Sequence, residues 1–309
     1  MVDPLVTAVG ISLLGPVVAG PALARGLNAL PQDRRRAIEW SLILGAVTLA
    51  IAVGLVGDHR MPGVAAYVLP ALPGLLTFVV WRSLLASALV SLMPMYFVIA
   101  LVVRDRGIFH APELALDRMM GLRPSWVFVY ASLYIFVVVL PLLVLRGRDL
   151  FRQTMRGYLA VMLTAYAGFL VYPTSAPRVE ELTGSGFTAW MLRLFYSIDA
   201  PYNCFPSLHV AYSFVSAFAC YRVHHGLGVT AIVWAALIAV STVFTKQHYA
   251  IDAIAGVVMG LAAYALFLRR LPRAAVPEEA RRAAPGRAGL AVALYGVMVA
   301  ALWVGYLAG

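Results

Sequence analysis

Two residues near position 250 have the types and the spacing of a catalytic pair. His248 and Asp252 are four residues apart, so on a helix both side chains lie on the same face. The Asp252 carboxylate can then accept the Nδ1–H of His248, which leaves Nε2 of the imidazole as a nucleophile. A structural hydrogen bond between helices is the alternative use of this pair. An aspartate inside an apolar segment is costly and by default marks a functional site, which favours catalysis.

A second histidine lies at the start of another apolar segment. His209 follows Ser207 in the stretch "NCFPSLHVAY", residues 203–212. The free N–H groups and the dipole of a helix start favour an anion. Ser207 can cap the helix and also donate its hydroxyl to a phosphate oxygen. Alone, His209 would be an ordinary interface histidine; beside His248 on the same side of a membrane, it is predicted to be catalytic.

Two cations can complete an anion site. Arg178 ends the stretch "YPTSAPR", and its planar guanidinium suits phosphate. Lys246 is the only lysine in the chain and lies two residues before His248. An interface anchor whose ammonium snorkels to the membrane surface is the alternative for Lys246.

Together these groups predict phosphoryl transfer without a metal. His248 would attack phosphorus, and His209 would protonate the leaving alkoxide and then deprotonate an incoming water or alcohol. The groups expected to hold the phosphate oxygens are Arg178, Lys246, Ser207 and the N–H groups at the helix start. Metal ligation is the rival use of two histidines and an aspartate. The chain has no HExxH, no CxxC and no paired carboxylates near the site, so we expect neither a metal nor another cofactor.

The elements that position these residues are predicted to be membrane helices. Hydrophobic residues make up 62% of the 309, and charged residues only 12%, about half of the share in a soluble domain. We therefore expect an all-α, polytopic membrane protein with about ten spans. The candidate spans are 5–23, 38–57, 64–81, 83–103, 125–145, 154–171, 207–221, 227–245, 248–268 and 290–307.

The distribution of basic residues predicts the orientation of the chain. With both termini outside, most of the 24 basic residues fall in inside loops. This topology brings the stretches 172–178, 204–209 and 241–252 to the outer face. The net charge of +10 then reflects topology and anionic headgroups, and nucleic acid is not an expected partner because the charge forms no single stripe.

The two cysteines are expected to be free. Cys204 and Cys220 lie at opposite ends of the seventh span, roughly 24 Å apart on a helix. A disulfide cannot bridge this distance, so both residues are interpreted as packing residues or free thiols.

The stretches around both histidines resemble the motifs of the type 2 phosphatidic acid phosphatase superfamily, which also includes vanadium haloperoxidases. Residues 206–209 match its Pro-Ser-Gly-His motif, with Leu208 in place of glycine. The residues that match its Ser-Arg-x5-His-x3-Asp motif are Ser241, His248 and Asp252, with Thr242 where the family has arginine. The resemblance implies phosphate binding at Ser207 and Leu208, and a six-helix catalytic core from about the fourth to the ninth span.

The family's first motif, Lys-x6-Arg-Pro, is poorly met. Arg178 follows a proline, and Val171 stands where lysine is expected. These departures resemble the inositol phosphorylceramide synthase branch, whose members transfer a phosphoalcohol headgroup between lipids. The branch's features are "YPTSAPR", "FPSLH" and, more weakly, "ALDRMMGLRPSW" at 115–126. Lys246 would then compensate for the motif arginine that is replaced by Thr242.

The predicted organisation is N-terminal helices in 1–103, a catalytic core in 104–268, and a basic cytoplasmic linker with the last span in 269–309. The expected substrate is a lipid phosphate or phosphodiester, with water or an alcohol as the acceptor. A transporter or lipid-binding protein is the alternative, although its polar residues would be expected near the bilayer midplane. A haloperoxidase is disfavoured because those relatives are soluble. The expected location is a bacterial plasma membrane with the site on the extracytoplasmic face, and a Golgi-type membrane with a lumenal site has the same topology.

Overall fold

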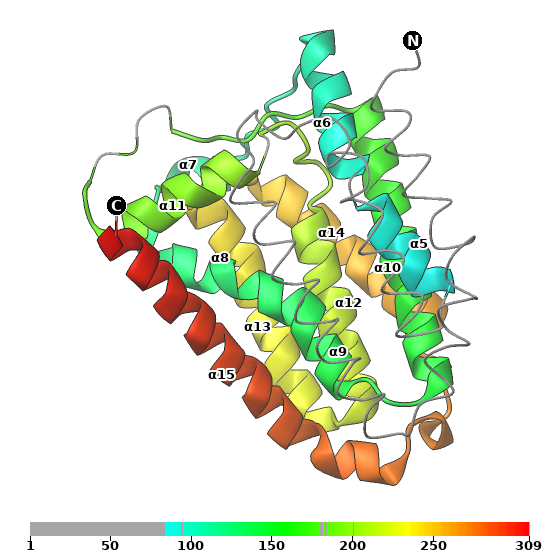
Figure 1. The fold of residues 1–309 in the computed structure, drawn as a ribbon. Helices are drawn as coiled ribbons and strands as arrows, with labels where there is room; N and C mark the ends of the chain where they lie inside the picture. Colours follow the sequence, from blue (N-terminus) through cyan, green and yellow to red (C-terminus); the bar gives the residue numbers. More distant parts are fainter. Residues whose placement is uncertain (1–83, 94, 180–181, 183, 200, 309) are drawn as a thin grey trace, which may run out of the picture. The chain divides into compact units, whose positions relative to one another are not determined.

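The computed structural model describes residues 84–308 except 94, 180–181, 183 and 200 (Figure 1). The predicted spans 5–23, 38–57 and 64–81 lie outside the described residues. The chain divides into two compact units, 1–98 and 99–309. The predicted span 83–103 consists of two helices, α5 (Leu84–Leu92) and α6 (Met95–Arg106).

The described part of the second unit is helical and contains no strand, only two isolated bridges. After α6 come α7 (Ala115–Met119), η1 (Pro124–Trp126), α8 (Val127–Tyr134), η2 (Ile135–Val139), α9 (Leu140–Val144) and α10 (Arg148–Val171). The remaining helices are α11 (Phe187–Ile198), α12 (Leu208–Val223), α13 (His225–Phe244), α14 (Ala250–Ala263), η3 (Tyr264–Leu268), η4 (Arg273–Ala275) and α15 (Glu278–Ala308). The prediction of an all-α fold is therefore confirmed for these residues.

Two glycines allow α14 to pack closely on α12. A Cβ atom added at Gly256 would lie 2.6 Å from the Ser207 carbonyl oxygen, and one at Gly260 would lie 2.5 Å from Cβ of Phe214. The spacing of these glycines is the small-xxx-small pattern that lets membrane helices approach each other. The helix starts of α12 and α14, near which His209 and His248 lie, are thereby held together.

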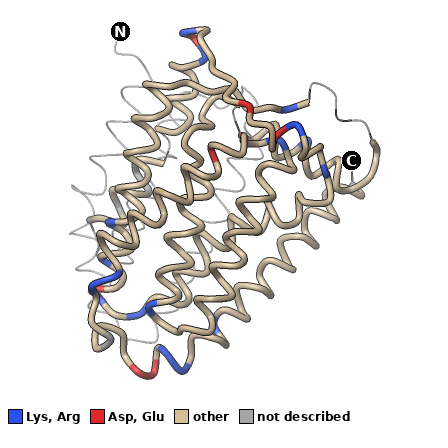
Figure 2. Tube along the Cα trace, turned by 180° about the vertical axis from the view of Figure 1, so that it is seen from behind, with Lys and Arg blue, Asp and Glu red and all other residues tan. Residues whose placement is uncertain are grey.

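Five helices in the described part of the chain are long and apolar enough to cross a membrane. They are Pro124–Val144, Arg148–Val171, His225–Phe244, Ala250–Leu268 and Glu278–Leu307. Ten spans and a six-helix core are not confirmed, partly because α12 has only 16 residues. In Figure 2 the charged residues lie mainly at helix ends and in connecting loops, which is the arrangement expected of a membrane protein.

The connection 172–206 contains a helix, α11. The last helix, α15, begins at Glu278 and includes Pro285, so part of the stretch before the predicted span 290–307 is helical. The cytoplasmic location of the basic linker stays a prediction. The orientation with both termini outside stays a prediction.

Candidate active site

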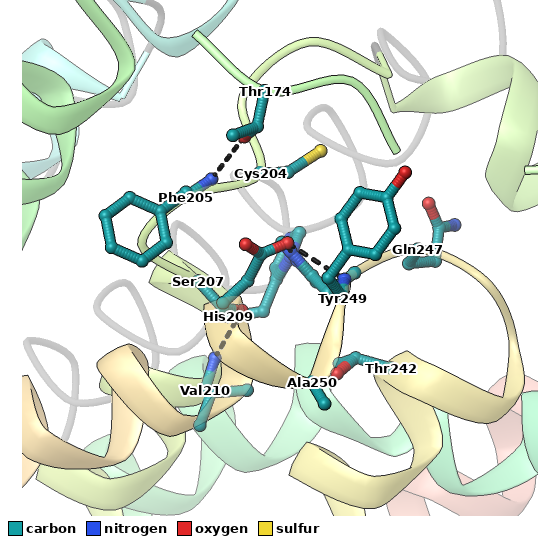
Figure 3. A network of polar contacts seen from close by, with 12 residues as sticks. Thr174, Cys204, Phe205, Ser207, His209, Val210, Thr242, Gln247, Tyr249 and Ala250 are labelled. Carbon is teal, nitrogen blue, oxygen red and sulfur yellow. Dashed lines mark hydrogen bonds and ion pairs between the residues drawn. The ribbon is translucent and has the colours of Figure 1, made fainter. Parts of the chain in front are cut away.

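The start of α12 is fixed by Ser207. Its Oγ accepts a hydrogen bond from the Val210 N–H at 3.4 Å, which confirms the predicted cap (Figure 3). The Ser207 N–H donates to the Asp252 backbone oxygen at 3.0 Å. Leu208 is the first residue of α12, and its apolar side chain is buried. The group that it can offer to an anion at the helix start is its backbone N–H. The two helix starts are thus bonded directly to each other.

The predicted pair of His248 and Asp252 forms, although His248 is not part of the helix. α14 begins at Ala250, and the His248 N–H donates to the Thr242 carbonyl at 3.2 Å. His248 Nδ1 lies 3.5 Å from Asp252 Oδ2, and this oxygen also accepts the Tyr249 N–H at 2.9 Å. Both side chains are buried, with His248 only 2% exposed. The carboxylate therefore caps α14 and faces the imidazole at the same time.

The two predicted catalytic histidines are in direct contact. His209 Nδ1 lies 3.2 Å from His248 Nε2. On the other side of His209, Nε2 lies 3.9 Å from Oδ2 of Asp199, a carboxylate that lies in none of the three motif stretches. When His248 carries its proton on Nδ1, its Nε2 lone pair faces His209 and accepts a hydrogen bond from Nδ1–H of that ring. Nε2 of His248 is then the atom that a phosphate would reach once this contact opens.

Arg178 lies beside this pair but is engaged by protein groups. Its Nε and Nη2 donate to Oε1 of Gln247, at 3.2 and 2.6 Å. Its Nη1 donates to the carbonyls of Tyr196 and Asp199, at 2.9 and 2.8 Å. Burial raises the pKa of Tyr196 to about 12, so this phenol stays neutral and donates to the Thr245 carbonyl at 2.7 Å. Arg178 therefore joins the loop after α10, the end of α11 and the His248 loop, and its role in phosphate binding stays a prediction.

Gln247 was not among the sequence-predicted site residues. Its orientation follows from Arg178, because a guanidinium only donates and must therefore face the amide oxygen. The other end of the amide, Nε2, is buried and has no hydrogen-bond partner. A buried N–H donor without a partner is costly, so this group is available for a bound anion.

Lys246 is not directed at the histidines. Its Nζ donates to the carbonyls of Asp117 and Met120, at 3.1 and 2.7 Å, and its backbone has a positive φ of 55°. The side chain thus fastens the His248 loop to α7 and the residue after it. Phosphate binding by Lys246 stays a prediction, and it would require these two bonds to break.

Asp117 supports the same loop from a distant part of the sequence. Its Oδ1 accepts the Ala250 N–H at 2.7 Å, across 133 residues, and its Oδ2 accepts the Leu114 N–H at 2.8 Å. The side chain is buried. Residue 117 lies in the stretch "ALDRMMGLRPSW", whose weak resemblance to the synthase branch did not single it out.

The structure brings the three predicted motif stretches together. Thr174, in the first stretch, accepts the Phe205 N–H with Oγ1 at 2.8 Å, and Figure 3 shows both residues above Ser207 and His209. Cys204 lies in the same loop. Donor atoms of Cys204, His248 and Asp252 all lie within 4.8 Å of one another. Cys204 and Cys220 are both free and buried, as predicted.

Comparison with known proteins gives a family match over the region that contains this site. A model of the PAP2 superfamily matches residues 99–266, which contain all the residues discussed above. A PA-phosphatase related-family protein of Dictyostelium discoideum is 29% identical over 97 residues, which cover 28% of this chain and 18% of that protein. The match therefore spans less than a fifth of this relative. No solved structure matches the chain.

Proposed function

The chain belongs to the PAP2 superfamily, and on this basis we propose that it transfers the phosphoryl group of a membrane lipid through a phosphohistidine at His248. The observation that carries the proposal is the 3.2 Å contact between His209 Nδ1 and His248 Nε2, with a carboxylate on the outer side of each ring. Such a series orients one imidazole as a nucleophile and the other as an acid. Family membership supports phosphatase-type chemistry without distinguishing hydrolysis from headgroup transfer.

In the first half of the reaction, His248 Nε2 attacks phosphorus and the bond to the leaving oxygen breaks. His209 donates its proton to that oxygen as it leaves. In the second half, water or an alcohol gives its proton to His209 and attacks phosphorus, which breaks the P–N bond and regenerates His248. In-line attack requires phosphorus between the two rings, with about 3–3.5 Å between the reacting atoms. The present contact must therefore open when substrate binds.

The phosphate oxygens would be held by donors around the two helix starts. These are the Leu208 backbone N–H, the Ser207 hydroxyl and Nε2 of Gln247, which lacks a partner. Arg178 would contribute by exchanging a protein acceptor for phosphate. The family's Ser-Arg-x5-His-x3-Asp motif has an arginine where this chain has Thr242. In this proposal Gln247, and not Lys246, supplies the phosphate donor that replaces this arginine.

The acceptor and the location complete the proposal. A phosphatase uses water, and a headgroup phosphotransferase of the inositol phosphorylceramide synthase type uses an alcohol. The buried surroundings of His248 and Asp252 suit an acceptor that displaces water. We place the protein in a plasma membrane, with the site on the extracytoplasmic face.

A headgroup-release assay on detergent-purified protein tests this function. Lipid phosphates and phosphodiesters are offered with and without alcohol acceptors, beside His248→Ala. Free phosphate that is lost in the variant indicates a phosphatase, and a new lipid that forms only with an acceptor indicates a transferase. Absence of turnover in every combination would contradict the proposal and favour the transporter alternative.

A further inference from the structure

The cysteine near the catalytic pair has no role in the proposed reaction. Cys204 is 3% exposed, and its Sγ donates to the Pro201 carbonyl at 3.5 Å. Its donor atom lies within 4.8 Å of those of His248 and Asp252. Thiol, imidazole and carboxylate are thus gathered in one buried place.

Two polar atoms of this group lack hydrogen-bond partners. Nδ1 of His248 and Oδ1 of Asp252 are both buried and make no hydrogen bond. Buried polar atoms in proteins are nearly always bonded, and exceptions indicate an unfilled requirement. A cation placed among the three side chains would bind Nδ1 of His248 and the Asp252 carboxylate.

The distances fit a tetrahedral cation better than a hydrogen bond. Two ligands about 2.1 Å from a zinc ion at the tetrahedral angle are about 3.4 Å apart. His248 Nδ1 and Asp252 Oδ2 are 3.5 Å apart, whereas an N–H···O hydrogen bond is typically about 2.9 Å. For the sulfur, a Zn–S bond of about 2.3 Å requires a separation near 3.6 Å from either neighbour. A shift of the Cys204 loop by about 1 Å closes the remaining gap.

We propose that Cys204, His248 and Asp252 form an inhibitory binding site for a thiophilic divalent metal ion, with Zn²⁺ as the best match. The combination of sulfur, nitrogen and oxygen donors is typical of zinc, with water as the fourth ligand. Binding releases the thiol proton, moves the ring proton of His248 from Nδ1 to Nε2, and forms three metal–ligand bonds. It involves no change in oxidation state.

Inhibition follows from the proposed function, while metal binding does not depend on it. A neutral imidazole that binds the cation through Nδ1 carries its ring proton on Nε2. The Nε2 lone pair that would attack phosphorus is then no longer present. The ion therefore acts against the catalytic pair without occupying the phosphate position.

Metal binding is tested directly with Co²⁺ as a spectroscopic probe. The full chain in detergent is titrated with Co²⁺, and Zn²⁺ is then added as a competitor. Cys204→Ser replaces the thiol with a poor metal ligand of similar size, and Cys220→Ser is the matched control at the other end of α12. We expect the thiolate-to-cobalt absorption in the wild type and in Cys220→Ser, its loss in Cys204→Ser, and its displacement by Zn²⁺. Equal absorption in both variants, or none in the wild type, would overturn the proposal.

Inhibition is measured on the same three proteins, each normalised to its own activity without zinc. Loss of an outer-sphere partner alone typically weakens metal binding 10–100-fold, so Cys204→Ser should raise the inhibitory Zn²⁺ concentration at least about tenfold. Cys220→Ser should leave it unchanged, and a chelator should restore activity. Identical inhibition of all three proteins would overturn the proposal. Cysteine-dependent cobalt binding in a protein that turns over no lipid phosphate would support the metal site and contradict the proposed function.

Discussion

The two histidines are supported in different ways. His248 is 2% exposed, its N–H is bonded to the Thr242 carbonyl, and its facing carboxylate is itself fixed by the Tyr249 N–H. The His209 side chain is 19% exposed, and its carboxylate neighbour Asp199 is 3.9 Å away in the loop after α11. On the His248 side, the starts of α12 and α14 are hydrogen-bonded to each other. On the His209 side, the facing carboxylate comes from the loop between α11 and α12. The difference suits a fixed nucleophile and an acid–base group that moves to admit the phosphate.

The largest expected effect separates the roles of the two rings. His248→Ala should reduce turnover at least about 10³-fold for every substrate, because the nucleophile is lost. His209→Ala should cost about 10²–10⁴-fold with a lipid alkoxide as leaving group. With a nitrophenyl phosphate the loss in the rate of nitrophenol release in the first turnover should be much smaller, since that leaving group needs no proton. Equal losses of the first-turnover rate for His209→Ala with both kinds of substrate would contradict its assignment as the general acid.

The next effect compares the two carboxylates. Asp252→Asn removes the negative charge that faces His248 Nδ1 and weakens the cap of α14, so kcat should fall about 10²-fold or more. Asp199→Asn acts on the more exposed side, and its loss should be about tenfold. Steady-state kinetics of both purified variants measures the difference. A larger loss in Asp199→Asn would reverse the proposed order of the two sides.

A smaller effect is expected at Asp117, which supports the His248 loop without touching substrate. Asp117→Asn weakens a charge-assisted bond to the Ala250 N–H, and the cost to stability should be about 1–3 kcal/mol. The midpoint temperature of thermal unfolding and kcat should both decrease. Glu113→Gln is the control on the same segment. Glu113 is exposed, and its ion pair with Arg118 is long at 4.0 Å, so this substitution should change neither quantity. A stable Asp117→Asn protein with full kcat would show that this brace is dispensable.

The contact between His248 and Asp252 and the helix cap at Ser207 could be predicted because their signal is local. His248 and Asp252 are close in sequence, and Ser207 and His209 share one helix start. The supporting groups could not be predicted, because their hydrogen bonds join segments that are distant in the sequence. Asp117 and Ala250 are 133 residues apart, and Arg178 and Gln247 are 69 residues apart. Lys246 was predicted as a phosphate ligand from its charge and from its place two residues before His248. Its left-handed backbone and its two carbonyl acceptors are properties of the folded loop that composition does not reveal.

The number of membrane spans was harder to predict than the site. Apolar segments were counted by hydropathy, yet α12 is shorter than a typical span and is largely buried by its neighbours. The start of the last helix was also misplaced, since Ala and Arg favour helix strongly enough to extend α15 back to Glu278. Hydropathy indicates which segments avoid water, and it does not distinguish lipid from protein as the surroundings.

The most direct test of the central claim is to trap the phosphorylated enzyme. Wild type, His209→Ala and His248→Ala are mixed with a lipid phosphate labelled at phosphorus, quenched rapidly, and analysed for protein-bound label that is stable in alkali and labile in acid. We expect label on His248 in the wild type and none in His248→Ala. With a labelled nitrophenyl phosphate, label should accumulate in His209→Ala, because its second half-reaction lacks a base. Label that persists in His248→Ala, or a labelled peptide that does not contain residue 248, would contradict the account.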